Sequence, residues 1–322
     1  MRLAPAGRLR LLFLAVALAA GIRAGDRPYE LSGRILPKAR AAISLFGATA
    51  PFSAATLTDS QGRFRFRALA PGQYTVAVLI PGRGELRKTV DVGPGSADLN
   101  RRVAIEVGVE DSELVSRDVQ RDQSTVSARE LSVPDAARRE YREAQKKLSR
   151  RDVPAAVAHL ERAVGMAPQF SAAWNTLGTI AYQSHHYGRA EEHFRKALDQ
   201  DPYSFEPLVN LGGALLTEGK IDEALSYNLF AVLTRPKDAL ANSQLGLNYF
   251  AIGNLDLGQK YLDIAKRIDP GHFSYPQLTL AEIYLRRHEP AAAARELHDF
   301  LQRHPDAPQT ARVRDLLEKL EK

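Results

Sequence analysis

The sequence contains no cysteine among its 322 residues. This absence excludes disulfide bonds, thiolate nucleophiles and zinc sites built from cysteine. Stability must therefore come from a hydrophobic core or from stacked repeats, and a chain of this length can bury enough apolar surface for either solution.

Catalytic motifs are also missing. The sequence has no Gly-x-Ser-x-Gly elbow, no phosphate-binding loop, no dinucleotide fingerprint and no His-Glu-x-x-His zinc helix. His185, His186 and His193 form the one histidine cluster, but two of them fall in a polar turn and no carboxylate set converges on them by spacing. We therefore expect solvent-facing histidines, no metal site, no cofactor and no enzyme activity.

A ten-residue apolar run, 11–20, lies near the N-terminus. Three arginines precede it and small residues follow it, in "MRLAPAGRLRLLFLAVALAAGIRAGD". This pattern is typical of a secretory signal peptide, and the run is shorter than the ~20 residues that span a bilayer. We predict a signal peptide at residues 1–24, cleaved after Ala24 or Gly21; a retained membrane anchor is the alternative.

Removal of that segment would leave a nearly balanced charge. Residues 1–24 hold four arginines and no acidic residue, so the formal net charge would fall from +6 to +2. A dedicated nucleic-acid partner requires a concentrated basic surface. We therefore expect no nucleic-acid partner and, after cleavage, no stable membrane span.

Prolines recur at a fixed spacing in the second half of the chain. Pro168, Pro202, Pro236 and Pro270 are 34 residues apart, and Pro305 follows after 35. A period of this length indicates a repeat array. Within residues 171–204, two amphipathic helices flank a polar turn, and proline ends the second helix because it lacks an amide hydrogen.

This segment resembles the tetratricopeptide repeat family through Trp174, Leu177, Gly178, Tyr182, Ala190, Phe194, Ala197 and Pro202. The resemblance implies an all-α solenoid with repeats at 137–170, 171–204, 205–238, 239–272 and 274–307, followed by a capping helix at 308–322. Gly178 and the alanines are expected to remove bulk where paired helices touch. The terminal repeats depart from the pattern, with Ala144 and Ala281 in place of that glycine.

Residues 28–107 show a different period, with short alternating or apolar runs separated by Gly, Pro and Asp. Such runs predict strands of a small antiparallel β-sandwich, here at 29–36, 41–47, 62–69, 72–80, 86–93 and 101–107. Phe64 and Phe66 are expected to point inward between exposed arginines, after a turn at 59–62.

The same segment resembles the carboxypeptidase regulatory-like domain, a transthyretin-like sandwich related in fold to starch-binding modules, through Thr58, Asp59, Gly62, Phe64, Phe66, Leu69, Pro71, Gly72 and Tyr74. The motif residues build turns and core, so the resemblance implies a fold and no peptidase activity. Some relatives bind glycans, for which Tyr29 and Tyr74 are the aromatic candidates here.

Residues 108–133 are rich in charge and predict a linker. Ser132, Pro134 and Asp135 then resemble a helix start, with Ser132 as the N-cap. The predicted fold is therefore multidomain β + α: a small antiparallel sandwich, then an all-α repeat solenoid at 134–322.

Tetratricopeptide arrays line their concave surface with the first helix of each repeat. By register, the predicted groove residues are Tyr141, Gln145, Asn175, Thr179, Tyr182, Val209, Leu216, Ser243, Leu247, Phe250, Glu282 and Arg286. An apolar centre with polar ends suits an extended peptide or a partner helix. Alternatively, Leu216, Leu247 and Phe250 pack between adjacent first helices. The family's clamp for chaperone carboxylates is not expected, because Tyr141, Gln145 and Thr176 occupy its positions.

These features favour an exported, non-enzymatic scaffold that binds a protein or peptide partner through the concave face. The alternative is a carbohydrate-binding envelope protein, with the sandwich on glycan and the repeats recruiting partners. The expected location is a bacterial envelope, either periplasmic or secreted.

Overall fold

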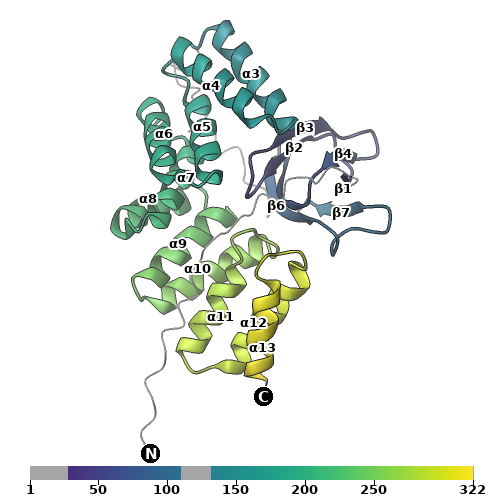
Figure 1. Cartoon of the computed structure of the whole chain (residues 1–322), viewed down its shortest axis with the longest axis vertical. Coiled ribbons are helices and arrows are strands. Elements are labelled where there is room, and N and C mark those ends of the chain that lie inside the picture. The colour runs from purple at the N-terminus through teal and green to yellow at the C-terminus, as the bar shows by residue number, and fades with distance from the viewer. Residues whose placement is uncertain (1–27, 110–131, 322) are drawn as a thin grey trace, which may run out of the picture.

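The computed structural model describes residues 28–109 and 132–321. The predicted signal peptide and residues 110–131 of the predicted linker lie outside the described residues. The described chain forms seven strands followed by eleven helices, which Figure 1 shows as a compact β-domain set against a curved array of helices. The predicted order of a sandwich and then a helical array is confirmed.

The sandwich has a three-stranded sheet, β4-β1-β7, and a four-stranded sheet, β3-β2-β5-β6. The strand bounds are β1 Tyr29–Leu36, β2 Ala42–Gly47, β3 Ser53–Leu57, β4 Arg63–Leu69, β5 Gly72–Ile80, β6 Gly84–Val92 and β7 Arg102–Gly108. Inward residues of both sheets form one core, which includes Leu31, Ile43 and Leu69 with no exposed surface.

Apolar and charged residues alternate along β4, so one face of this strand is buried and the other faces solvent. Phe64 and Phe66 are 5% and 6% exposed, whereas the side chains of Arg63, Arg65 and Arg67 keep more than half of their surface in solvent. Period-2 patterning of this kind is what a strand with one buried face requires. The predicted inward direction of both phenylalanines is confirmed.

Two features of the sandwich differ from the prediction. The sequence analysis missed β3, whose sequence SAATL lacks the large apolar residues that mark a strand and whose side chains are not buried. The β1–β7 pairing is parallel, from Glu30 opposite Arg102 to Leu36 opposite Gly108, while the other four described pairings are antiparallel. Pairing direction depends on chain connections, which alternation within a strand does not record.

The array consists of five helical hairpins and a final helix. Their bounds are α3 Asp135–Ser149 with α4 Val153–Met166, α5 Ser171–Gln183 with α6 Tyr187–Gln200, α7 Phe205–Thr217 with α8 Ile221–Thr234, α9 Ala239–Ala251 with α10 Leu255–Ile268, α11 Pro276–Arg286 with α12 Pro290–Arg303, and α13 Thr310–Leu320. Val313 and Leu317 of α13 are buried against the last hairpin, so this helix covers the end of the array.

Small residues allow the two helices of a hairpin to touch. A Cβ atom added at Gly178 on α5 would lie 2.5 Å from the ring of Phe194 on α6, closer than real Cβ contacts. Phe194 is 1% exposed and also packs with Leu211 and Ala214 of the next hairpin. One aromatic side chain thus joins two neighbouring repeats, which is how a solenoid builds a continuous core.

The turn inside each hairpin contains one residue with left-handed backbone. These residues are Arg151, His185, Gly219, Gly253 and His288, with φ from 59° to 83°. Their spacing follows the 34-residue period, so His185 occupies a position set by turn geometry and not by metal ligation. Only glycine adopts this conformation without steric cost.

The start of the array differs from the prediction at one residue. Pro134, and not Ser132, occupies the N-cap of α3, and no side chain caps this helix. Ser132 instead accepts a hydrogen bond from Gln169 at 3.2 Å, and Val133 is buried in the first repeat's core. The sequence motif therefore located the helix start to within two residues but gave the serine the wrong role.

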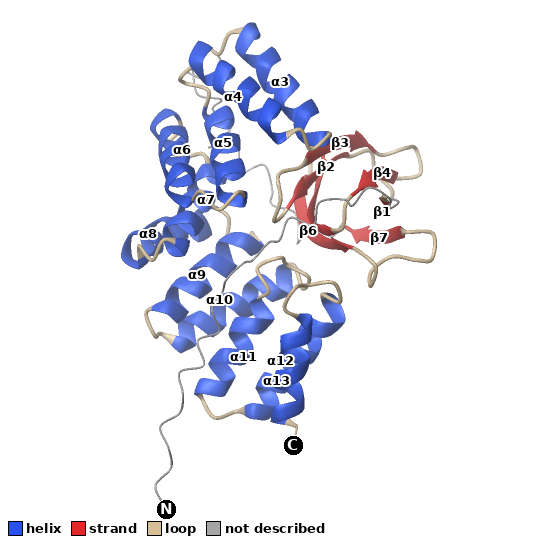
Figure 2. Ribbon diagram, viewed as in Figure 1, coloured by secondary structure: helices blue, strands red, loops and turns tan. Residues whose placement is uncertain are grey.

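The sandwich docks on the array. Figures 1 and 2 show the helices curving around the side of the sandwich that carries β2, β3 and β6. Contacts between α3 and β3 lie at one end, and hydrogen bonds from β6 and the loop after it reach the last two repeats at the other. The concave surface that the sequence predicts as an open groove is thus partly covered by the chain's own N-terminal domain.

Candidate functional site

A cavity of about 780 Å³ lies between the four-stranded sheet and the concave side of the array. The array contributes residues from α3, α5, α7, α9 and α10, and the sheet contributes residues from β2, β3, β5 and β6. Cavities of this size are typical of ligand-binding sites, which often occur at domain interfaces. This cavity is the candidate functional site.

Polar side chains from adjacent first helices form the array wall of the cavity. The amide of Asn210 on α7 donates to the carbonyl oxygen of Asn175 on α5 at 3.0 Å, and Asn210 also approaches Thr179 at 3.5 Å. The hydroxyls of Tyr141 on α3 and Thr176 on α5 are 3.3 Å apart. These contacts run from helix to helix, so a row of hydrogen-bonding groups crosses the first three repeats.

The sheet wall combines an aromatic patch with charged groups. Phe46 on β2 is 41% exposed, and Phe52 contacts the guanidinium of Arg151 from the α3–α4 turn, 5.0 Å from the ring centre. Phe46 pairs with Ser53 and Thr75 on the neighbouring strands, so the floor around it consists of small and polar residues. A large exposed ring above such a floor offers an apolar contact inside the cavity.

Charged groups at the cavity are paired across the two domains. Arg87 on β6 contacts Glu85 at 2.6 Å and Glu206 of α7 at 3.1 Å, and Arg235 contacts Glu206 at 3.0 Å. Burial disfavours the charged form of Arg87, but Glu85 and Glu206 outweigh it and raise its pKa. Burial likewise opposes ionisation of Glu206, yet Arg87 and Arg235 lower the pKa of its carboxyl. Arg87 and Glu206 therefore both stay charged at neutral pH.

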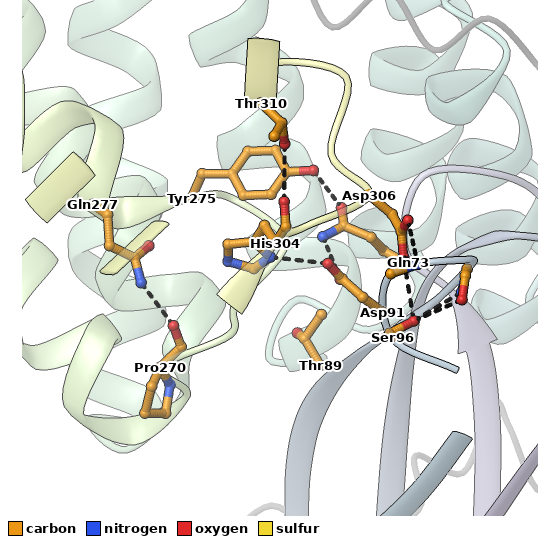
Figure 3. A network of polar contacts seen from close by, with 12 residues as sticks. Gln73, Thr89, Asp91, Ser96, Pro270, Tyr275, Gln277, His304, Asp306 and Thr310 are labelled. Carbon is orange, nitrogen blue, oxygen red and sulfur yellow. Dashed lines mark hydrogen bonds and ion pairs between the residues drawn. The ribbon is translucent and has the colours of Figure 1, made fainter. Parts of the chain in front are cut away.

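A second polar network joins β5 and β6 to the last repeat (Figure 3). Tyr275 donates to the Oε1 of Gln73 at 2.9 Å, and the amide of Gln73 donates to Asp91 at 2.9 Å. The Nδ1 of His304, whose side chain has no exposed surface, lies 3.2 Å from the other oxygen of Asp91. Burial raises the pKa of the Tyr275 hydroxyl, and Asp91 adds to this effect.

Two buried titratable groups flank this network. Asp269, which is 4% exposed, accepts a hydrogen bond from the backbone N–H of Thr89 at 2.9 Å. Burial raises the pKa of Asp269 to about 6, despite the opposing effect of that hydrogen bond. Burial lowers the pKa of His272 to about 3, and His304 contributes in the same direction.

The predicted groove residues separate into three groups. Tyr141, Gln145, Asn175 and Thr179 line the cavity. Val209 and Ser243, at 3% and 0% exposed, are buried between helices and cannot contact a partner in this structure. The third group does not line the cavity, and its side chains are half-buried or exposed: Tyr182, Leu216, Leu247, Phe250, Glu282 and Arg286.

Packing explains the third group. Leu216, Leu247 and Phe250 join hydrophobic clusters between neighbouring repeats, as the alternative interpretation proposed. Tyr182 shares a hydrogen bond with Thr217 at 3.0 Å. Arg286 covers the ring of Phe250 and pairs with Glu282 at 2.6 Å, so these polar ends are satisfied within the array.

The sequence analysis missed Asn210, Glu206 and the whole sheet wall. The register that selects Asn175 also selects Val209, but α7 presents the next residue, Asn210, to the cavity. A second register, shifted by one residue, would have selected Thr176, Asn210 and Gln244. No sequence signal could have placed Arg87 beside Glu206, because 119 positions separate them.

The three histidines of the turn region do not converge. His185 contacts Tyr187, while His193 stacks on Trp174 with ring centres 5.6 Å apart, and burial lowers the pKa of His193. Across the described ranges, no three His, Asp or Glu side chains gather closely enough to hold a metal ion. Nor does any helix in these ranges have the length and apolar content needed to cross a bilayer.

Within the described part of the chain, an apolar stripe lies on the outer face of α8. Leu229, Phe230 and Leu233 are 39%, 41% and 71% exposed. On the equivalent face of α6, the residues 34 positions earlier are all charged: Arg195, Lys196 and Asp199. This stripe provides a comparison surface for any test of binding at the concave side.

Comparisons with known proteins agree with this architecture. Residues 31–106 match the model of the carboxypeptidase regulatory-like domain, and residues 141–205 match a model of the tetratricopeptide repeat. A comparison with curated proteins found no match.

Solved structures of similar fold include PilW, described as a widely conserved type IV pilus biogenesis factor, with 20% identity and a TM-score of 0.52 over 58% of this chain and 86% of PilW. PilF from Pseudomonas aeruginosa has 21% identity and a TM-score of 0.50 over 60% and 86% of the two chains. MamA from Desulfovibrio magneticus RS-1 has 23% identity and a TM-score of 0.48 over 55% and 99%. At these identities the similarity shows the fold alone. The chain thus combines a carboxypeptidase regulatory-like domain with an array of helical hairpins of the tetratricopeptide-repeat type.

Proposed function

We propose that this protein is an exported, non-enzymatic scaffold that holds an extended segment of a protein partner in the cavity between the sheet and the array. The Asn175–Asn210 pair carries the proposal. A side-chain amide offers both a donor and an acceptor, so asparagine can bind the N–H and C=O groups of a peptide backbone. The hydrogen bond between the two asparagines uses only the amide nitrogen of Asn210 and the side-chain oxygen of Asn175.

The free functions of this pair are available to a ligand. Among the described residues, no hydrogen bond engages the amide nitrogen of Asn175 or the carbonyl oxygen of Asn210. Both side chains line the cavity. A bound chain could therefore receive one hydrogen bond and donate another, while Phe46 offers apolar contact to a side chain.

The non-enzymatic part of the proposal is supported by the pairing of charges. Arg87 and Arg235 both pair with Glu206 across the cavity wall, and Arg87 also pairs with Glu85. Groups that are locked in ion pairs are poor candidates for general acid or base, which must exchange a proton during a reaction. The export part rests on the N-terminal sequence, with its arginines, apolar run and small residues.

Glycan binding by the sandwich has less support. Tyr29 and Tyr74, the aromatic candidates, are 6% and 3% exposed and belong to the sandwich core. A buried ring cannot stack on a sugar. The scaffold hypothesis is therefore the one we retain.

Site-specific photo-crosslinking tests the proposal. A photo-crosslinking amino acid that replaces Gln145, inside the cavity, is expected to capture a partner protein in cells. The same crosslinking amino acid in place of Leu233, on the apolar stripe of α8, is expected to capture none. An Asn175→Ala/Asn210→Ala variant should reduce the yield at Gln145 about tenfold, because two net hydrogen bonds are worth ~1–3 kcal/mol together.

Position Leu99, which lies in a fully exposed loop of the sandwich, serves as a second control. Capture from Leu233 alone would assign binding to the outer face of α8. Equal capture from all three positions would indicate non-specific contact, and either result would reject the cavity as the binding site.

A further inference from the structure

Contacts between the sandwich and the array extend along the whole concave side. We define the docking seam by the bonds that join residues of the two domains: Arg151 to Tyr74 at 2.6 Å, Gln183 to Gly47 at 2.9 Å, Glu206 to Arg87 at 3.1 Å, Asp269 to Thr89 at 2.9 Å, Tyr275 to Gln73 at 2.9 Å, His304 to Asp91 at 3.2 Å and Asp306 to Gly95 at 2.8 Å. Every repeat contributes at least one of them.

Donors and acceptors lie on both sides of the seam: Arg151, Gln183 and Tyr275 of the array donate to the sandwich. Glu206, Asp269 and Asp306 of the array accept hydrogen bonds, and the sandwich supplies a guanidinium and backbone N–H groups. Asp306 accepts from both the backbone of Gly95 and the hydroxyl of Ser96, which lies 3.3 Å away. A Cβ atom at Gly93 would lie 2.5 Å from Asp306, so the loop after β6 fits closely over this carboxylate.

The docked sandwich covers the surface that the proposed partner would use. Asn175 and Asn210 line the array side of the cavity and are half-buried, with the sheet as the opposite wall. A chain that enters with its side chains must pass between the two domains. Access therefore depends on how often the seam separates.

We infer that the sandwich is a gate: in a closed form it blocks entry to the cavity, and a partner segment enters while the seam is open and is then held between the two domains. This inference rests on the proposed function, because it concerns the same cavity. The sandwich is covalently linked to its docking surface, so it returns to the array at a high effective concentration. The apparent association rate of a partner then decreases in proportion to the population of the open form.

Thiol labelling measures opening without any ligand. The chain has no cysteine, so an Asn175→Cys substitution introduces a single reactive group inside the cavity. A polyethylene-glycol maleimide is too large for the closed cavity and reports exposure of the concave face. An Asp306→Ala/Tyr275→Phe pair of substitutions weakens the seam at residues that do not line the cavity. We expect the labelling rate of the Asn175→Cys thiol to rise about tenfold in this background.

Two controls make the result specific. A Ser226→Cys reporter on the exposed face of α8 should be labelled at the same rate with or without the seam substitutions. Arg151→Gly releases the opposite end of the seam, and glycine suits the left-handed backbone there, at φ 59°. This substitution should also accelerate labelling at Asn175→Cys.

Equal labelling rates for the Asn175→Cys thiol in the wild-type, Asp306→Ala/Tyr275→Phe and Arg151→Gly backgrounds would overturn the gate. The test is independent of the photo-crosslinking experiment. A gate that opens without any partner captured at Gln145 would leave the gate standing and reject the proposed function.

Discussion

Replacing Phe194 by alanine is expected to lower the free energy of unfolding by about 3–5 kcal/mol, the usual cost of removing a buried phenylalanine. Phe194 is 1% exposed, lies against Gly178 within its own hairpin and packs with Leu211 of the next hairpin. The substitution opens a cavity at the junction of two repeats. Urea unfolding followed by circular dichroism at 222 nm measures the loss.

Tyr203→Ala is the matched control. This aromatic side chain lies in the turn that follows α6 and is 67% exposed, so its removal should change the free energy of unfolding by less than about 0.5 kcal/mol. If both substitutions cost the same, Phe194 does not join the repeats as the structure shows.

An Asp269→Asn variant is expected to lose stability in mild acid relative to the wild type. The pKa of Asp269 is raised from 3.8 to about 6, so the folded protein holds this proton more tightly than the unfolded chain. Its contribution is fully present below pH ~4 and is lost as the pH rises through 6. Between pH 7 and pH 4 the wild type should therefore gain on the order of 3 kcal/mol relative to the variant.

His272 gives the opposite dependence in the same region. Its pKa is lowered from 6.5 to about 3, so its contribution is fully present above pH 6.5 and is lost as the pH falls toward 3. The two groups offset each other in the wild type between pH 6 and 4. The variant lacks the offset, and its unfolding free energy should fall more steeply there.

Urea unfolding of both proteins at pH 7, 5.5 and 4.5 checks this prediction. Lys88, Asp91 and His304 also face the seam and are unchanged in the comparison, so the difference between the two proteins isolates Asp269. A constant difference across the pH range would show that Asp269 is not buried against Thr89.

Local pattern was sufficient to predict most of the secondary structure. The spacing of the prolines and the residues around Gly178 reflect contacts inside one hairpin. These contacts recur every 34 residues, so the sequence pattern is sufficient to predict them. The strand positions follow from alternation, as at Phe64 and Phe66. β3 was missed because its small residues are not buried and carry no such pattern.

The candidate site was only half predictable. Tyr141, Asn175 and Thr179 follow from repeat register, since each lies on the concave side of a first helix. On α7 the repeat register selected Val209, which is buried, whereas the adjacent residue Asn210 lines the cavity. Repeat spacing alone does not distinguish two adjacent positions on a helix.

The sequence did not predict the contact between the sandwich and the array. Asp91 and His304 meet although 213 positions separate them, and neither belongs to a periodic pattern. Surface residues on a sheet and turn residues on a repeat are polar whether they face solvent or one another. The covered groove could therefore be recognised only from the three-dimensional arrangement.

A disulfide across the seam tests the docked arrangement most directly. A Cβ atom at Gly93 would lie 3.1 Å from the Cβ of Asp306, close to the ~3.5–4.5 Å of a disulfide, and the absence of native cysteine prevents other pairings. Oxidation of the full-length Gly93→Cys/Asp306→Cys variant, followed by mass spectrometry, should show a bond within one chain, and a Gly93→Cys/Ser226→Cys control should show none. Two free thiols in the folded Gly93→Cys/Asp306→Cys variant would contradict the account, because the sandwich would not rest on the array.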